Sequence, residues 1–531
     1  MECNQPYVEQ GAPMNVLAGY QDETVDVFAP ANDHLQLVIG KLKAPPARRM
    51  THSEVERLIQ TDGVELLRLL FQGYIDTHGR GEAKEDVRDA SGLLRTHRPR
   101  EGRALMTLFG EVELRERQGY GARDESVLYP LDGKLNLPPD RCSFGTRKRV
   151  AEECSKVSFE QAVLSVNTTT GAHVAKRQAE QLAQRAAADF EAYYEKRSAP
   201  TESPGSVLVT TFDQKGIVMR VEDLRDATRK AAEERVHTYA TRLSPGEKSD
   251  TKRMAAVAAV YTIAPHPRTP DDVMPARPIP ADERVPAPRP ENKRVWASVV
   301  KDSREVIHAG FEEAVRRDPH RTKDWVALVD GNKDQLRFLR RCKRVFGVTV
   351  TIILDFIHVL EYLWKAAHAF YGKGNPAAES WVRKRGLEVL RGKAGYVAGG
   401  MRRSATLRGL RGRARKRVDR AARYLLKHRA FLRYDEYLAK GYPIATGVIE
   451  GACRHLLVDR LDITGARWGL QGAEAVIKLR ALRSSGDFED YWDFHEAQEL
   501  HRNHAVRYAS AHIPKVHDPL ARPQLQLVRE A

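Results

Sequence analysis

The chain has 531 residues, which suggests roughly two to four domains, and 42% of them are apolar, enough for a substantial core. Lys and Arg number 87 against 71 Asp and Glu, and the net charge of +16 favours a polyanionic partner, with nucleic acid ahead of an acidic membrane. The five cysteines are far apart and form no Cys-x-x-Cys pair, which argues against a zinc knuckle or a thioredoxin-like site and predicts a reducing, cytoplasmic environment. The first residues lack a signal-peptide pattern, and no apolar run approaches the roughly 20 residues needed to cross a bilayer, so we expect no membrane association.

The N-terminal part is predicted to be helical apart from one hairpin. Residues 1–50 show little periodicity and are expected to be weakly ordered. Residues 52–78 place apolar side chains at helical spacing. Residues 107–120 alternate around Gly110, which predicts a β-hairpin, and residues 121–145 form a connection rich in turn residues.

Residues 148–185 are predicted to form two helices joined by a polar turn at residues 167–171. This pattern is typical of a helix-turn-helix, whose second helix would bring Lys176 and Arg177 to DNA. An ordinary helical hairpin gives the same pattern, so that alternative stays open.

Strands that alternate with helices predict an α/β core in the middle of the chain. Residues 206–221 contain two β-favouring runs on either side of an acidic residue and a turn, and residues 252–265 are a further strand candidate. A helix is expected at about 294–317. Residues 325–336 begin with a buried strand, and residues 348–371 begin with a β-branched run and then become helical.

Two segments are expected to depart from this alternation. Residues 265–290 contain nine prolines, which indicates a surface loop or linker. Residues 372–440 are helical and very basic, with 17 Lys or Arg but only two acids between positions 383 and 429. An ordinary ion-paired face mixes both signs, so this region is predicted to bind phosphates. Residues 442–492 are mostly helical, and the polar tail beyond residue 512 is expected to be loose.

Three acids end or follow apolar runs: Asp213, Asp330 and Glu450. Each one alone is more often a turn or helix-cap residue. Taken together they can be interpreted as a metal site, because two-metal phosphoryl transfer needs a few carboxylates that converge on ions about 4 Å apart. Two strand ends and one helix can supply that geometry on a rigid base.

Asp355 and His358 form a further candidate pair where a strand becomes a helix. At i and i+3 their side chains share a helix face, so they could line the acidic site. A helix-capping Asp beside a packed His is an equally good interpretation.

At these residues the chain resembles bacterial insertion-sequence transposases of the ISKra type, which are distantly similar to Mutator-like DDE transposases. The resemblance covers roughly residues 60 to 495. It is carried by FDQKG (212–216), VALVDG (326–331), ILDFIHVLEYLWKAA (353–367), the segment from PIATGVIEGACRHLL to VIKLRAL (443–482), and, nearer the N-terminus, LFGEVELRER and YPLDGKLNLP.

The resemblance implies an α/β fold with an RNase H-like catalytic core, interrupted by an all-helical insertion and preceded by a mainly helical DNA-binding region with a small β-hairpin. It assigns the catalytic and metal-binding carboxylates to Asp213, Asp330 and Glu450. It makes Asp355 and His358 accessory residues near the active site. Asp355 competes with Asp330 for the role of second metal ligand.

The activity implied is metal-dependent DNA cleavage and strand transfer with two Mg²⁺ ions, for which Mn²⁺ could substitute. The expected partner is double-stranded DNA, at the element ends and at the target, bound by a homo-oligomer. Two alternatives stay open, a catalytically inactive DNA-binding relative and a structure-specific nuclease on the same fold. Further DNA-binding candidates are Arg402, Arg403, Arg413, Arg415, Lys416, Arg417 and Arg454.

These expectations divide the chain into seven regions. They are a poorly ordered N-terminus (1–50), a helical and hairpin region (51–145), a helix-turn-helix-like region (146–200), the first part of the core (201–371), the basic insertion (372–440), the second part of the core with the Glu (441–500) and a tail (501–531).

Overall fold

The computed structural model describes residues 26–122, 126–234, 251–277, 286–463 and 465–519. The chain forms two compact units, one of residues 1–135 together with 505–531 and one of residues 136–504. None of the described helices is both long enough and apolar enough to cross a membrane.

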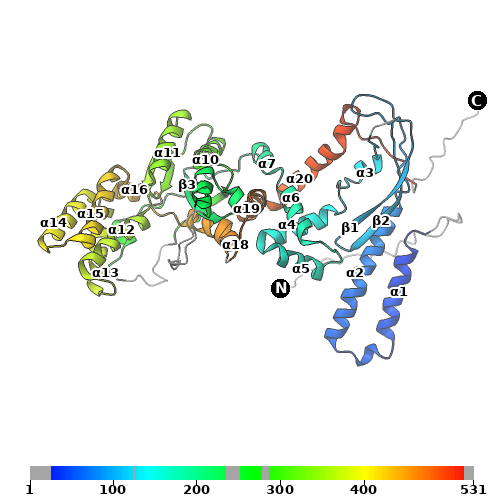
Figure 1. Ribbon diagram of the computed structural model, residues 1–531, viewed down its shortest axis with the longest axis horizontal. Coiled ribbons are helices and arrows are strands. Elements are labelled where there is room, and N and C mark those ends of the chain that lie inside the picture. Colours follow the sequence, from blue (N-terminus) through cyan, green and yellow to red (C-terminus); the bar gives the residue numbers. More distant parts are fainter. Residues whose placement is uncertain (1–25, 123–125, 235–250, 278–285, 464, 520–531) are drawn as a thin grey trace, which may run out of the picture. The chain divides into compact units, whose positions relative to one another are not determined.

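The first unit combines a helical hairpin with a two-stranded antiparallel sheet (Figure 1). Val87, Tyr120, Leu128 and Tyr508 form a small buried cluster in it, so residues near the C-terminus complete this unit. Its elements are α1 (Ala29–Lys43), α2 (His52–Asp76), β1 (Arg100–Thr107), β2 (Gly110–Gln118) and α3 (Pro130–Lys134).

The long helix predicted here is confirmed by α2. A hairpin is also present, but the prediction placed it at 107–120, whereas its first strand, β1, ends at Thr107 and only β2 lies in that range. The expectation of weak order was wrong for residues 29–43, which form α1 with a proline in its first turn. Helix α1 packs on α2, and Lys41 pairs with Asp62 at 2.8 Å. Tertiary contacts of this kind are not visible as a periodic pattern in a short segment. Residues 1–25 of the predicted disordered region lie outside the described residues.

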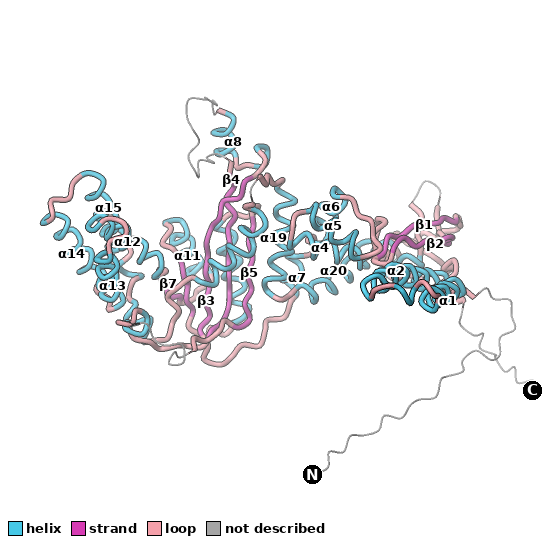
Figure 2. The backbone as a smooth tube through the Cα atoms, turned by 90° about the horizontal axis from the view of Figure 1, so that it is seen from below, coloured by secondary structure: helices cyan, strands magenta, loops and turns pink. Residues whose placement is uncertain are grey.

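The second unit is built around a mixed five-stranded sheet with the strand order β5-β4-β3-β6-β7. Strands β3, β4 and β5 pair antiparallel, whereas β6 and β7 run parallel to β3. The strands of this sheet are magenta in Figure 2. The strands are β3 (Val207–Val218), β4 (Lys252–Ile263), β5 (Glu291–Ser298), β6 (Trp325–Val329) and β7 (Val350–Leu354).

Helices lie on both faces of this sheet. Phe212 of β3 packs against Gly310 of α10, where an added Cβ would lie 2.7 Å from the ring. Side chains alternate along a strand, so Asp213 points to the opposite face, where α17 and the helical turn after it pack. The helices that precede or follow the sheet strands closely are α8 (Asp226–Glu233), α9 (Pro270–Val273), α10 (Ser303–Arg317), α11 (Lys333–Val345) and α12 (Phe356–Tyr371).

The remaining helices of this unit form two groups. A basic group packs on α12 and consists of α13 (Pro376–Leu390), α14 (Ala394–Leu407), α15 (Gly412–Lys427) and α16 (Tyr434–Ala439), coloured yellow-green to orange in Figure 1. The other helices are α4 (Phe144–Lys156), α5 (Phe159–Thr169), α6 (Lys176–Ala186), α7 (Phe190–Lys196), α17 (Gly447–Ala452), a π-helical turn (Cys453–Val458), α18 (Asp459–Leu461), α19 (Leu470–Ser485) and α20 (Phe488–Asn503).

Two predictions about the sheet were wrong. The helix expected at 294–317 begins only at Ser303, because residues 291–298 form β5, whose Val295 and Trp296 are buried against β4. Residues 206–221 do not form two strands around a turn. They form one 12-residue strand that stays paired with β4 throughout, with Asp213 opposite Val257.

Candidate active site

Asp213 and Asp330 lie level with each other on neighbouring strands. The parallel pairing of β3 and β6 runs from Leu208 opposite Trp325 to Thr211 opposite Leu328. Asp213 comes two residues after Thr211, and Asp330 comes two residues after Leu328. Neighbouring strands are about 4.8 Å apart, so the two carboxylates meet at the point where the parallel pairing ends.

The same register extends to a third acid. Val329 of β6 lies opposite Leu354 of β7, so the residues that follow, Asp330 and Asp355, are also level with each other. Asp330 and Asp355 follow the ends of β6 and β7, and Asp213 lies within β3 just beyond its parallel pairing, so the three aspartates form a row. The sequence carried a sign of this row, because VTTFD, VALVD and TIILD each place an Asp after an apolar run.

The negative charge of Asp330 is disfavoured by its surroundings. Burial raises the pKa of its carboxyl above the ordinary value, and the negative charge of Asp213 raises it further. The backbone N–H of Asn332 donates to Oδ1 over 2.8 Å and acts in the opposite direction, as does the charge of His358. A neighbouring cation would relieve both the burial and the repulsion.

Asp355 is already fully engaged by protein donors. Its side chain is buried with no exposed surface, and Oδ1 caps α12 by accepting the N–H of Ile357 over 2.9 Å. Oδ2 accepts from His358 Nδ1 over 3.0 Å and from the Thr446 hydroxyl over 2.5 Å. The helix-cap interpretation of Asp355 is therefore confirmed, and its partner His358 reaches a cavity shared with Asp330.

Glu450 approaches the row from a helix. It lies in α17, which packs on β3 and β4, and its side chain is exposed. One turn later, the thiol of buried Cys453 donates to Asp213 Oδ2 over 3.2 Å. Burial, and then the charges of Asp213 and Glu450, raise the pKa of this thiol, so it stays protonated and remains a donor. Cys453 begins the π-helical turn, an irregularity often found at functional sites.

Asp213 and Asp330 thus lie level on neighbouring strands and Glu450 lies on the helix that leads to Cys453, but these three carboxylates form no tight triad. Among the described residues, a group with one ligand atom from each of three side chains, all within 4.8 Å of one another, is found at Asp189, His495 and Glu499 and at no other place. A two-ion site does not require such a triad. One carboxylate can be shared by both ions while the other ligands lie further apart.

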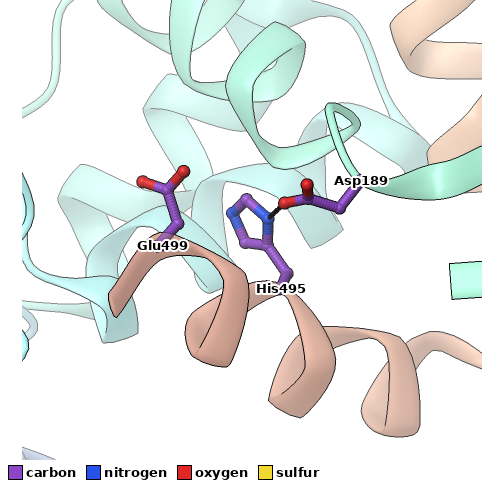
Figure 3. A group of neighbouring side chains, drawn as sticks. All are labelled: Asp189, His495 and Glu499. Carbon is purple, nitrogen blue, oxygen red and sulfur yellow. Dashed lines mark hydrogen bonds and ion pairs between the residues drawn. The ribbon is translucent and has the colours of Figure 1, made fainter. Parts of the chain in front are cut away.

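The Asp189, His495 and Glu499 group was not predicted from the sequence, and Figure 3 shows it between α7 and α20. His495 Nδ1 lies 2.7 Å from Asp189 Oδ2, and His495 Nε2 has no hydrogen-bond partner among the residues that the structure describes. Burial would raise the pKa of Asp189, but the hydrogen bonds from His495 and Arg502 outweigh it and lower the pKa to about 2.

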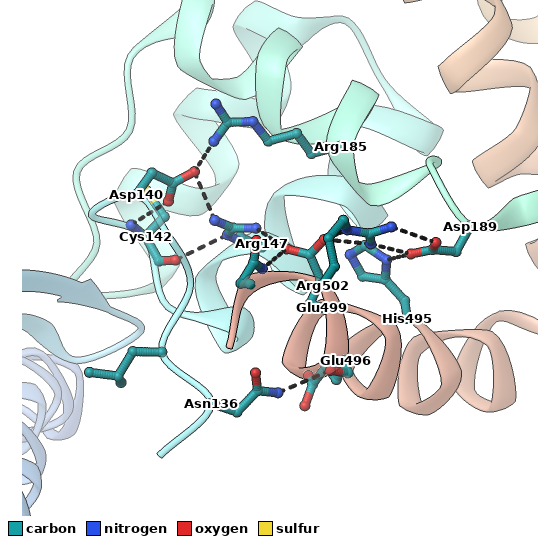
Figure 4. A network of polar contacts seen from close by, with 12 residues as sticks. Asn136, Asp140, Cys142, Arg147, Arg185, Asp189, His495, Glu496, Glu499 and Arg502 are labelled. Atoms are coloured by element: carbon teal, nitrogen blue, oxygen red, sulfur yellow. Dashed lines mark hydrogen bonds and ion pairs between the residues drawn. The ribbon is translucent and has the colours of Figure 1, made fainter. Parts of the chain in front are cut away.

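The carboxylates of this group are occupied by arginines, as Figure 4 shows. Arg502 donates to Asp189 over 2.8 and 3.0 Å and to Glu499 over 2.6 Å. Arg147 lies 3.4 Å from Glu499 and 2.8 Å from Asp140. Two guanidinium groups beside the ligand atoms disfavour a metal cation, so the arrangement is better suited to clamping α4, α7 and α20 together.

The predicted DNA-binding cations lie in three places. Lys176 and Arg177 begin α6, and Lys176 lies 3.5 Å from Glu160 of α5. Arg454 lies in the π-helical turn and pairs with Asp459 at 3.5 Å. The others belong to α14 and α15. Arg402 and Arg403 are on α14, and Arg413, Arg415, Lys416 and Arg417 are on α15.

Some residues that build the site were missed in the sequence. Thr446 and Cys453 hold the acids in place, and Tyr424 of α15 donates its hydroxyl to the backbone oxygen of Asp330 over 3.1 Å. These contacts join residues more than 90 positions apart, so no local spacing reveals them.

Comparison with known proteins leaves the family of the chain open. No protein-family model matches it, and no curated protein matches it either.

Proposed function

We propose that this protein is a DDE transposase with an RNase H-like core, in which Asp213, Asp330 and Glu450 hold two Mg²⁺ ions. The observation that carries the proposal is the placement of Asp213 and Asp330 level on neighbouring parallel strands, with Glu450 on a helix that packs on β3, the strand of Asp213. A mixed sheet with three antiparallel strands followed by two parallel ones is the arrangement expected of an RNase H-like core.

The donor set fits a hard divalent cation. Mg²⁺ prefers oxygen ligands and usually takes only one or two carboxylates while it keeps several waters. Asp213 and Asp330 repel each other, and burial adds to the cost of their charges. Asp355 is saturated by three protein donors, and this favours Asp330 over Asp355 as the second ligand. When bound, the ions would activate the attacking oxygen and stabilise the leaving oxygen of the phosphodiester.

The residues of the chain itself contribute position and charge. Cys453 orients the Asp213 carboxylate by donating to Oδ2. Asp355 orients His358 through Nδ1, which leaves Nε2 able to approach a phosphate in the cavity that His358 lines. The basic helical insertion supplies the positive surface that long DNA requires.

The proposal is tested with a supercoiled plasmid that carries the gene with its native flanking sequence, incubated with purified protein, Mg²⁺ and a second plasmid as target. A transposase yields cut ends and also junctions between element ends and target, read by sequencing. Cut ends without junctions would indicate the structure-specific nuclease instead. Binding without either product, at any Mg²⁺ or Mn²⁺ concentration, would contradict the proposal.

A further inference from the structure

Helix α15 has one face that is basic apart from Tyr424. At about 100° per residue, six cations fall within about 120° of the helix circumference. The opposite face is apolar and fully buried, with Val418, Ala421, Ala422 and Leu425. The six cations are Arg413, Lys416, Arg417, Arg420, Arg423 and Lys427, named here the α15 basic face.

The charges of the α15 basic face are not balanced within the chain. Among the described residues, no ion pair involves any of its six members, whereas Arg402 and Arg415 outside it both pair with Asp419. Each cation of this face has another one three or four residues away along the helix, and like charges at that spacing destabilise a helix. A face that costs helix stability and lacks acidic partners in the described part of the chain is suited to an anionic partner.

The C-terminal end of this face reaches the candidate active site. Arg420, Arg423 and Lys427 line a cavity of about 350 Å³ together with Asp330 and His358. Tyr424, on the same helix, donates to the backbone oxygen of Asp330 over 3.1 Å and stacks on Tyr362 of α12 with ring centroids 3.9 Å apart. The position of the basic face relative to Asp330 is therefore fixed by a hydrogen bond and an aromatic stack.

The length of the face matches a short run of DNA. Arg413 and Lys427 are 14 positions apart, so the face is about 21 Å long at a rise of about 1.5 Å per residue. One DNA strand has a charge about every 3.4 Å along the duplex axis, but the strand also winds around that axis, so the face can contact only a few successive phosphates. At the inner end the cations share the cavity with Asp330 but form no ion pair with it within the described chain, which leaves the carboxylate available to a metal ion.

We propose that the α15 basic face is a phosphate track, along which the backbone of one DNA strand runs into the cavity and presents a phosphodiester to Asp213 and Asp330. This inference rests on the proposed function, and it distinguishes α15 from the other basic helices of the insertion. Arg420, Arg423 and Lys427 act as binding residues for the phosphates nearest the cut.

The test is the salt dependence of DNA binding in a triple variant, Arg420→Gln, Arg423→Gln and Lys427→Gln. A fluorescently labelled linear duplex of mixed sequence is titrated between about 50 and 200 mM salt, where each lost phosphate contact lowers the slope of log K against log salt by about 0.9. The track predicts a slope smaller by about 2 to 3. The matched control, Lys230→Gln, Lys293→Gln and Lys343→Gln, removes three exposed cations of the same unit that lie outside the basic insertion and should keep the wild-type slope.

Each single variant should lower the slope by about 1, which guards against an effect of misfolding in the triple variant. If the triple variant is folded and its slope equals that of the wild type, the proposed phosphate track is wrong. Displacement of the duplex by inorganic phosphate at constant ionic strength, with wild type and not with the triple variant, would identify a small-anion site instead and equally overturn it. The readout needs no cleavage, so loss of slope in a protein that never cuts DNA would refute the proposed function and leave the track standing.

Discussion

The thiol of Cys453 donates a hydrogen bond to Asp213 Oδ2 over 3.2 Å. This contact joins the π-helical turn after α17 to the central strand of the sheet, and with it joins the helix of Glu450 to Asp213. The two carboxylates lie 237 positions apart in the sequence, by the difference of their numbers. Their relation therefore depends on this packing.

Removing the donor from Cys453 should weaken metal binding without unfolding the protein. In Cys453→Val the Asp213 carboxylate loses the hydrogen bond that orients it, a contact worth about 0.5–1.5 kcal/mol. We expect the Mg²⁺ concentration for half-maximal DNA cleavage to rise by roughly 2- to 10-fold. Cys453→Ser keeps a donor and should stay near wild type. Equal Mg²⁺ requirements in the two variants would show that the thiol does not position Asp213.

Thr446 is predicted to matter for stability through Asp355. Its hydroxyl donates to buried Asp355 Oδ2 over 2.5 Å, so Thr446→Val leaves a buried carboxylate short of a donor. The expected loss is about 1–3 kcal/mol in the free energy of unfolding. Thr446→Ser retains the hydroxyl and should lose less. Urea denaturation of both variants measures the difference, and a Val variant as stable as the Ser variant would refute the role.

His358 should titrate above its ordinary pKa. The hydrogen bond to Asp355 raises the pKa, burial opposes it, and the charges of Asp355, Asp330 and Glu361 raise it further. A raised pKa stabilises the fold below the unfolded-state value of about 6.5, and this stabilisation is lost as the pH rises through the folded-state pKa. His358→Gln should therefore lose stability at about pH 5.5 and much less above the folded-state pKa. NMR titration of labelled histidine should show the His358 pKa falling in Asp355→Asn.

The ion-pair network of Asp189 should depend on pH and not on metal. The lowered pKa of Asp189, about 2, gives stability that is present above the ordinary Asp value and is lost as the pH falls through the folded-state value. We expect Asp189→Asn to lower the melting temperature at pH 7, with a smaller difference from wild type in acid. Prolonged dialysis against a chelator should leave the wild-type melting temperature unchanged. A drop after dialysis that Zn²⁺ or Mn²⁺ restores would show that the network holds a metal.

Local patterns in the sequence were sufficient to predict most helices and strands, and were insufficient to predict the contacts between them. Apolar runs ending in Asp predicted β6 and β7 correctly, because a buried parallel strand is a continuous apolar segment. Asp213 was assigned to a strand end, yet β3 continues to Val218, because its antiparallel partner β4 extends beyond the end of β6. Pairing with a partner strand sets such boundaries, and the partner is distant in sequence.

The same limit applies to the basic insertion. Its composition predicted a phosphate-binding surface, but the residues singled out there mixed two environments. Arg415 pairs with Asp419, whereas Lys416 and Arg417 lie on the unpaired face of α15. Helical spacing could have separated these faces. That the face ends beside Asp330 follows only from the packing of α15 on α12.

The most direct test of the proposed two-metal site is Mg²⁺-dependent cleavage of the plasmid with native flanks by Asp213→Asn, Asp330→Asn and Glu450→Gln. The control is Asp226→Asn, which changes an exposed acid of α8 with one surface ion pair. If these carboxylates hold the metal ions, each of the three variants binds DNA as wild type does and cuts at least about 100-fold more slowly. This is a loss of about 2.7 kcal/mol or more in transition-state stabilisation. The control cuts at the wild-type rate. Cleavage at the wild-type rate by Asp213→Asn would contradict the proposed two-metal site.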